Sequence, residues 1–141
     1  MNSMSLASAI VDLDGTLAIR QSRNPYDFSA ADNDLPDDCI VHLVRALSQS
    51  GWEIIVVTGR EEKFRSLTER WLFAHLGIHG KLFMRCDGDY RPDTTIKREI
   101  YETSIRDRFN VQIVLDDRRR VVEMWRNELG LRCLQVRDGD F

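Results

Sequence analysis

Two carboxylates at the end of a short apolar run are the first residues of this sequence whose types and spacing are typical of a catalytic or metal-binding site. Asp12 and Asp14 follow the run 9–11 and precede Gly15 and Thr16. On a β-strand, side chains at i and i+2 point to the same face, so both carboxylates would face one point beyond the strand end. Two like charges this close repel unless a cation lies between them or one holds a proton. A solvated pair of aspartates in a turn is the alternative that these two residues alone leave open.

Four further apolar runs, at 52–57, 81–84, 111–115 and 131–136, alternate with helical patterns. This alternation predicts an α/β fold, a Rossmann-like three-layer sandwich with a mainly parallel five-stranded sheet. In such sheets, ligands bind beyond the carboxyl ends of the strands. The polar residues at those ends should therefore gather at one edge of the sheet; they are Asp12, Asp14, Thr58, Arg60, Asp116 and Asp117.

The segments between the runs contain four helical patterns and one long polar connection. The second helix is expected to begin near Glu61, and the third to run to about Arg108. Residues 18–36 show no helical period and are interpreted as a polar connection. Connections of this length without structure of their own are more often functional than idle.

Composition predicts one globular domain over residues 1–141, with residues 1–8 as a disordered tail. The chain has 141 residues, of which 43% are hydrophobic and 30% charged. It has no signal-peptide pattern and no apolar run long enough for a membrane span, so a cytoplasmic protein without membrane contact is expected. Cys39, Cys86 and Cys133 fit reduced, mostly buried thiols. The net charge of −3 argues against a protein that coats duplex DNA, but not against a local arginine cluster at one nucleic-acid end.

The order of the polar residues resembles that of haloacid-dehalogenase-type phosphohydrolases: Asp12-Leu13-Asp14-Gly15-Thr16-Leu17, then Thr58, then Lys97, then Asp116-Asp117. The resemblance implies that Asp12 is the nucleophile and that Asp14 is the general acid and base. It also implies that Thr58 binds a phosphoryl oxygen and that Lys97 offsets the transferring charge. Taken alone, Lys97 is more typical of a solvated helix and Thr58 of an ordinary turn.

Mg²⁺ is the cofactor that this resemblance implies. Mg²⁺ prefers hard oxygen ligands in octahedral geometry. Asp12, Asp116 or Asp117, and the backbone carbonyl of Asp14 would supply such oxygens together with water. The sequence does not decide which of Asp116 and Asp117 would bind the metal directly.

A closer resemblance is to the 3′-phosphatase domain of bacteriophage-type polynucleotide kinase-phosphatase. It is carried by Arg23-Asn24-Pro25-Tyr26-Asp27, Val56-Val57-Thr58-Gly59-Arg60, Lys97-Arg98-Glu99-Ile100, Leu115-Asp116-Asp117-Arg118 and Val121-Val122-Glu123-Met124-Trp125-Arg126. The resemblance makes Arg23 and Arg60 substrate-binding groups and Asp93 a supporting carboxylate beside Lys97. A guanidinium suits phosphate because it donates two parallel hydrogen bonds.

The spacing of the motifs leaves no room for a large cap domain. Residues 15–57 separate Asp14 from Thr58 and already hold a helix and a strand. Only residues 59–96 separate Thr58 from Lys97. The site should therefore be open, and an open site admits the end of a polymer, whereas small-metabolite phosphatases usually close a lid. No G-x-x-x-x-G-K-[ST] motif occurs, so kinase activity is not expected of this sequence.

These observations together predict a Mg²⁺-dependent polynucleotide 3′-phosphatase that acts on DNA or RNA 3′ ends, and by family resemblance on 2′,3′-cyclic phosphate ends. Self-association and a separately encoded kinase or ligase partner are open questions that the resemblance raises. Two alternatives remain at this point. One is a phosphatase of free nucleotides or another small phosphomonoester, and the other is a non-catalytic module that binds nucleic-acid ends.

Overall fold

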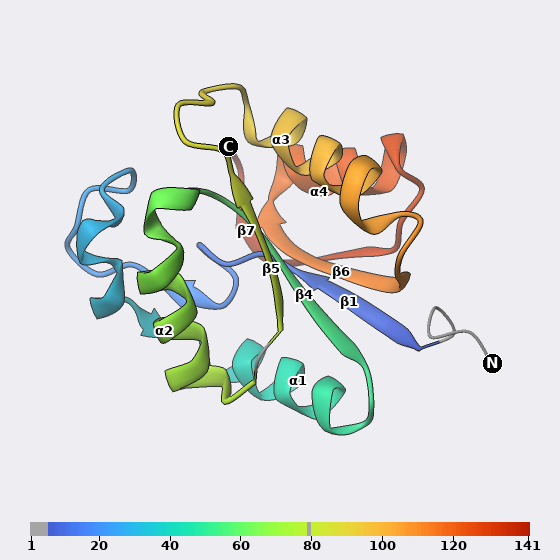
Figure 1. Ribbon diagram of the computed structural model, residues 1–141, viewed down its shortest axis with the longest axis horizontal. Coiled ribbons are helices and arrows are strands. Elements are labelled where there is room, and N and C mark those ends of the chain that lie inside the picture. Colours follow the sequence, from blue (N-terminus) through green and yellow to red (C-terminus); the bar gives the residue numbers. More distant parts are fainter. Residues whose placement is uncertain (1–5, 79) are drawn as a thin grey trace.

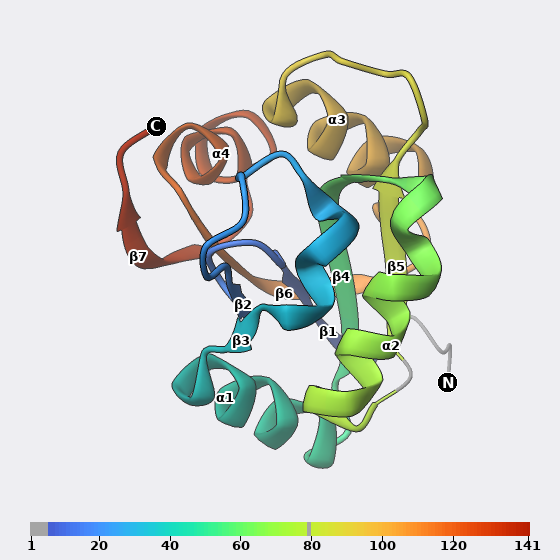
Figure 2. The ribbon, with the colours of Figure 1, turned by 90° about the vertical axis from the view of Figure 1, so that its left-hand side faces the viewer.

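The computed structural model describes residues 6–78 and 80–141, in which a central parallel sheet lies between two layers of helices (Figures 1 and 2). The sheet has five strands in the order β5-β4-β1-β6-β7. Their bounds are β1 Ala7–Val11, β4 Glu53–Glu61, β5 Lys81–Arg85, β6 Asn110–Arg118 and β7 Cys133–Gly139. Every pairing between them is parallel, which confirms the predicted fold class.

The helices lie in pairs on the two faces of the sheet (Figure 1). One face carries α1 (Asp38–Gln49) and α2 (Arg65–Leu76), and the other carries α3 (Asp93–Ile100) and α4 (Arg119–Glu123). Both of the latter continue into a π-helical turn, η4 (Tyr101–Ile105) and η5 (Met124–Glu128). The third helix therefore ends near the predicted Arg108, but its last turn is wider than an α-helix.

Alternate residues of β1 build the two hydrophobic cores. Ala9 and Val11 pack with residues of α1 and α2, whereas Ile10 packs with residues of η4, α4 and η5. Side chains of a strand point alternately to its two faces, so a central strand covered on both sides must be apolar throughout. This is why the run 9–11 lacks the polar alternation of a half-exposed strand.

The connection over residues 18–36 has more structure than the sequence predicted. It contains β2 (Ala18–Ile19), the 3-10 helix η2 (Phe28–Asn33) and β3 (Leu35–Pro36), and β2 pairs with β3 in an antiparallel arrangement. Tertiary contacts hold it in place, since the Trp71 indole N–H donates to the Asp34 carbonyl at 2.9 Å. Such contacts leave no periodic signal in the segment itself.

Three smaller expectations need correction. β4 extends to Glu61, and a 3-10 turn η3 (Glu62–Phe64) precedes α2, so the second helix begins at Arg65. Cys39 and Cys86 are exposed, and only Cys133 is buried. The predicted tail 1–8 overlaps β1 at residues 7 and 8, while residues 1–5 lie outside the described part of the chain.

No helix within the described ranges has the length and apolar character of a membrane span.

Candidate active site

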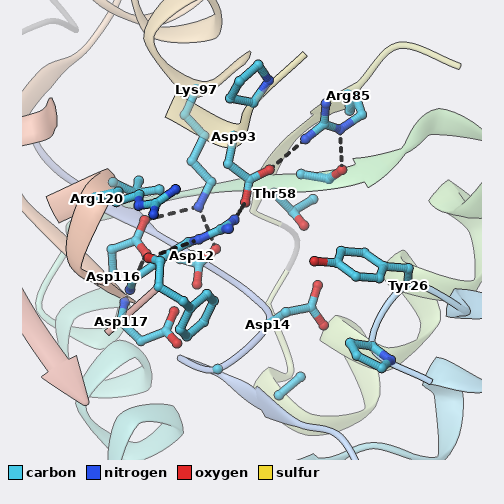
Figure 3. A pocket seen from close by; sticks show the side chains of 18 of the residues that line it. Asp12, Asp14, Tyr26, Thr58, Arg85, Asp93, Lys97, Asp116, Asp117 and Arg120 are labelled. Carbon is cyan, nitrogen blue, oxygen red and sulfur yellow. Dashed lines mark hydrogen bonds and ion pairs between the residues drawn. The ribbon is translucent and has the colours of Figure 1, made fainter. Parts of the chain in front are cut away.

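Three neighbouring strands bring the predicted residues to one edge of the sheet. Val11 of β1 pairs with Val56 of β4 on one side and with Leu115 of β6 on the other. The next residue, Asp12, continues this register, because its N–H donates to the Leu115 carbonyl at 2.9 Å. Asp12 therefore lies between Thr58 and Asp116 beyond the carboxyl end of β1 (Figure 3).

Three buried carboxylates meet at this point. Asp12, Asp116 and Asp117 each offer one oxygen, and these oxygens lie within 4.8 Å of one another. Lys97 of α3 is the cation that faces them: its Nζ donates to Asp12 Oδ1 at 2.7 Å and to Asp116 Oδ2 at 3.0 Å. The Thr16 hydroxyl donates to the other Asp12 oxygen at 2.9 Å.

Burial and crowding set the protonation behaviour of this cluster. Burial raises the pKa of Asp12 well above the ordinary carboxyl value, and the neighbouring charge of Asp116 raises it further. Burial alone would lower the pKa of Lys97, but the charges of Asp116 and Asp12 outweigh burial, and the pKa lies above the usual lysine value. Lys97 is therefore a permanent cation, and the three carboxylates would exceed it in charge if all were ionised. A bound divalent cation would relieve the remaining repulsion.

The donor set fits Mg²⁺. Carboxylate oxygens are the hard ligands that Mg²⁺ prefers, and the three groups come from two adjacent strand ends that fix their positions. Asp116 is held especially well, because its Oδ1 accepts the N–H groups of Asp117 at 2.9 Å and Arg118 at 3.3 Å. Its Oδ2 accepts the indole N–H of the fully buried Trp125 at 3.2 Å. Sequence reasoning used Trp125 as part of the resemblance motif 121–126 and as an apolar residue that could favour self-association, and it missed this contact because the contact joins two elements.

The loop after β1 passes very close to the Asp117 side chain at Gly15. Gly15 has φ +86°, and a Cβ at this position would overlap the Asp117 side chain. Glycine is the residue that tolerates both the positive φ and the close approach. The Gly15 turn therefore allows the loop after β1 to pass directly against a candidate metal ligand.

Asp14 lies apart from the three-carboxylate group, and two arginines hold it. Arg60 donates to both of its oxygens, from Nε to Oδ2 at 2.9 Å and from Nη2 to Oδ1 at 2.7 Å. Arg23 Nη2 donates to Asp14 Oδ1 at 3.3 Å and binds Asp34 at 2.7 Å. The Asp14 side chain is still 35% exposed and lines the cavity, so a substrate can reach it.

Arg23 and Arg60, which the sequence predicts to bind substrate, make hydrogen bonds to carboxylates of the protein itself. Arg60 is 1% exposed and is absent from the cavity lining, whereas Arg23 lines the cavity. The donors of Arg23 are directed at Asp34, Asp14 and three backbone carbonyls of its own loop. The carboxylates of Asp14 and of the buried Asp34 occupy both guanidinium groups with charge-assisted hydrogen bonds. The two arginines position Asp14. Sequence reasoning missed Asp34, because it lies in the polar connection 18–36, where no motif or helical period marks it.

Asp93 is held at the mouth of the cavity by two further arginines. Its oxygens accept from Arg85 at 2.6 Å and from Arg118 at 2.9 Å. Burial would raise the pKa of Asp93, but the charges of Lys97, Arg118 and Arg85 together lower it. Asp93 therefore stays ionised, and its ion pairs join the ends of β5 and β6 to α3.

Thr58 has its hydroxyl free to donate. Its Oγ1 accepts the Arg60 N–H at 3.2 Å, and a hydroxyl that accepts in this way keeps its own O–H for another partner. Thr58 lines the same cavity as Asp12, Asp14 and Lys97. The volume of this cavity is about 1260 Å³. Pockets for small molecules usually measure ~300–1,000 Å³. No large cap domain covers the site among the described residues.

A parallel sheet with a nucleophile-type aspartate at β1, a lysine from α3 and a carboxylate pair at β6 defines a phosphohydrolase of the haloacid-dehalogenase type. The model of one family, described as the polynucleotide kinase PNKP phosphatase domain, matches residues 7–141. The chain belongs to this family.

Relatives agree with this assignment. A bifunctional polynucleotide kinase/RNA ligase of Autographa californica nuclear polyhedrosis virus is 34% identical over 126 residues, which are 85% of this chain and 18% of the viral protein. A solved structure titled Pnkp1/Rnl/Hen1 complex has a TM-score of 0.92 at 42% identity, covering 99% of this chain and 49% of its own. A second, titled Pnkp1/Rnl/Hen1 RNA repair complex, has a TM-score of 0.93 at 41% identity, covering 100% and 46%. The chain thus spans half or less of each of these relatives.

Proposed function

We infer that this protein is a Mg²⁺-dependent polynucleotide 3′-phosphatase. The observation that carries the inference is the cluster of Asp12, Asp116, Asp117 and Lys97 at the carboxyl edge of the sheet, with Asp14 held beside it. When bound there, Mg²⁺ would neutralise phosphoryl oxygens that otherwise repel a carboxylate. The side chains of Asp12 and of Asp116 or Asp117, with the Asp14 carbonyl, would hold it.

In the first half-reaction, Asp12 attacks phosphorus and forms an aspartyl-phosphate. The bond between phosphorus and the ester oxygen breaks, and the departing alkoxide takes a proton from Asp14. Thr58 donates its O–H to a phosphoryl oxygen, and the Lys97 ammonium offsets the charge that develops between nucleophile and phosphate. Arg60 keeps Asp14 in a single orientation through its two parallel hydrogen bonds.

In the second half-reaction, water hydrolyses the aspartyl-phosphate. Asp14, now ionised, takes a proton from that water and regains the form that it had at the start. Phosphate leaves, and Asp12 is again a carboxylate. The exposure of Asp14 supports this double role, because both the leaving group and the water must reach it.

A nucleic-acid end is the substrate class that the molecule supports best. The family is named for the polynucleotide kinase phosphatase domain, and solved relatives are titled as RNA repair complexes. The cavity exceeds the usual small-molecule size, which suits the end of a polymer. These titles also support a separately encoded ligase or kinase partner. A phosphatase of free nucleotides is the rival with the same chemistry.

The decisive assay compares a 3′-phosphorylated oligonucleotide with a nucleoside 3′-monophosphate, a 2′,3′-cyclic phosphate end and p-nitrophenyl phosphate, in Mg²⁺ and in EDTA. We expect the oligonucleotide to have the highest kcat/KM and EDTA to abolish turnover. Equal or better turnover of the mononucleotide would overturn the end-repair function.

Asp12→Asn tests the nucleophile in the same assay. We expect no hydrolysis of any substrate and no loss of thermal stability, because the substitution removes one charge from a crowded acidic cluster. Binding of the oligonucleotide without hydrolysis separates this result from misfolding. Retained hydrolysis would refute the assignment of Asp12.

A further inference from the structure

Two tyrosines stand exposed at the rim of the active-site cavity. Tyr26 and Tyr90 are each 83% exposed, and both line the cavity that contains Asp12 and Asp14. Tyr26 lies on the Asp14 side of the site, with its ring turned toward it (Figure 3). Large aromatic side chains that a protein leaves in water beside its active site are typical of binding surfaces.

The loop that carries Tyr26 is fixed by an arginine. Arg23 Nη1 donates to the carbonyls of Asn24 at 3.2 Å and of Pro25 and Asp27 at 3.3 Å. The same guanidinium binds Asp34 and Asp14, so the loop is joined directly to the candidate acid and base.

The loop that carries Tyr90 is fixed in the same way by another arginine. Arg85 Nη1 donates to the Asp89 carbonyl at 2.9 Å and also to the Arg91 carbonyl, on either side of Tyr90. Its Nε donates to the Gly59 carbonyl at 2.7 Å, which anchors the loop to β4. Each tyrosine ring is thus presented to solvent from a backbone that is already ordered, and a preordered surface loses little entropy when a ligand binds.

Cationic side chains outnumber acidic ones around the cavity, although the whole chain carries a net charge of −3. Among the described residues, eight basic and six acidic side chains line it. Arg20 and Arg120 are exposed in this lining, and neither guanidinium group makes a hydrogen bond or ion pair within residues 6–78 and 80–141. Free guanidinium groups in a cavity suit the phosphates of a nucleic-acid backbone.

We propose that Tyr26 and Tyr90 are stacking platforms for the last bases of a single strand whose 3′ end lies at Asp12, and that Arg20 and Arg120 bind its backbone phosphates. This inference rests on the proposed function and adds the form of its substrate. Two tyrosine rings on two separate loops can stack only on two bases whose faces are not already covered by neighbouring bases. A single strand offers them, whereas a blunt duplex offers only the outer face of its last pair.

Kinetics of the tyrosine variants on a single-stranded 3′-phosphorylated RNA octamer test the stacking. We expect Tyr26→Ala and Tyr90→Ala each to lower kcat/KM by about 5- to 100-fold, mostly through KM, because base stacking on an aromatic side chain has this magnitude. The loss should exceed any loss on p-nitrophenyl phosphate at least fivefold. Tyr26→Phe and Tyr90→Phe keep the ring and should stay near wild type.

Salt dependence tests the arginines independently. Each phosphate contact with a single strand contributes about 0.7 to the slope of log affinity against log salt. Arg20→Ala and Arg120→Ala should each reduce the slope of log Kd for the octamer by about that amount. Arg45→Ala, an exposed arginine on α1 outside the cavity, is the matched control and should leave the slope unchanged.

The outcomes separate this inference from the proposed function. If the wild-type protein hydrolyses the octamer but the alanine variants match it, or if they lose equally on p-nitrophenyl phosphate, the stacking platforms are refuted alone. If a blunt duplex with the same 3′ end is hydrolysed as well as the octamer, the single-strand preference is refuted. If the wild-type protein fails on the octamer but hydrolyses mononucleotides, the proposed function and the platforms fail together.

Discussion

Replacement of Lys97 by methionine should destabilise the metal-free protein strongly, since it leaves two buried carboxylates without their shared cation. The Lys97 side chain is 3% exposed and makes ion pairs with Asp12 at 2.7 Å and with Asp116 at 3.0 Å. Loss of one partner from a buried pair costs about 3–5 kcal/mol. Whole domains are stable by only about 5–15 kcal/mol. For a chain of this size, we expect Lys97→Met to lower Tm in EDTA by roughly 10–20 °C.

The pH dependence of this loss has a defined sign. The charge of Lys97 lowers the pKa of Asp12 against the effect of burial, so its removal raises that pKa further. A carboxyl whose pKa is raised by folding contributes stability below its unfolded-state pKa, near ~4, and this contribution is lost as the pH rises through the folded-state pKa. The difference in unfolding free energy between variant and wild type should therefore widen as the pH rises above the folded-state pKa that Asp12 has in the wild type.

Urea unfolding in EDTA and in Mg²⁺ measures both effects. Mg²⁺ should stabilise Lys97→Met more than the wild type, because a cation that binds only the folded state raises its stability and here replaces the missing charge. Lys81→Met, at an exposed position at the start of β5, controls for the substitution itself. A variant as stable as the wild type in EDTA at neutral pH would refute the charge balance that we assign to Lys97.

Three further predictions follow from single contacts. Arg60→Lys loses the two parallel hydrogen bonds to the acid/base carboxylate, so kcat on the oligonucleotide should fall about 100-fold; the loss should shrink with p-nitrophenyl phosphate, whose leaving group needs no proton. Gly15→Ala should weaken Mg²⁺ binding in calorimetry, because its Cβ overlaps Asp117, whereas Gly51→Ala, also at positive φ but with open space, should not. Cys133, whose pKa burial raises to about 12, should react with a thiol reagent only after unfolding, unlike the two exposed cysteines.

The sequence predicts the sheet, and the gathering of polar residues at its edge, for one physical reason. Buried parallel strands must be apolar, and their polar continuations, such as Asp12, Thr58 and Asp116, therefore mark the strand ends where ligands bind. Both features are local in sequence. The right-handed crossover rule then places all of them at the same edge.

What the sequence does not predict depends on contacts between distant elements. Arg23 and Arg60 carry the right chemistry for phosphate, but Asp14 and Asp34 occupy their donors. The Trp125 indole reaches Asp116 only because η5 packs under β6, and no spacing rule signals such a bond. In each case a tertiary partner decides the role of the side chain.

The central position of β1 in the sheet has a consequence for how the protein folds during translation. β1 pairs with β4 and with β6, and Asp12 meets Lys97 from 85 residues away. Contacts between such distant segments form slowly, because a long loop must close first. A nascent chain whose α3 and β6 are still within the ribosome has Asp12, the proposed nucleophile, but neither Lys97 nor the pair Asp116 and Asp117. The cluster of Asp12, Lys97, Asp116 and Asp117 can therefore assemble only late in translation, when nearly all of this domain has emerged.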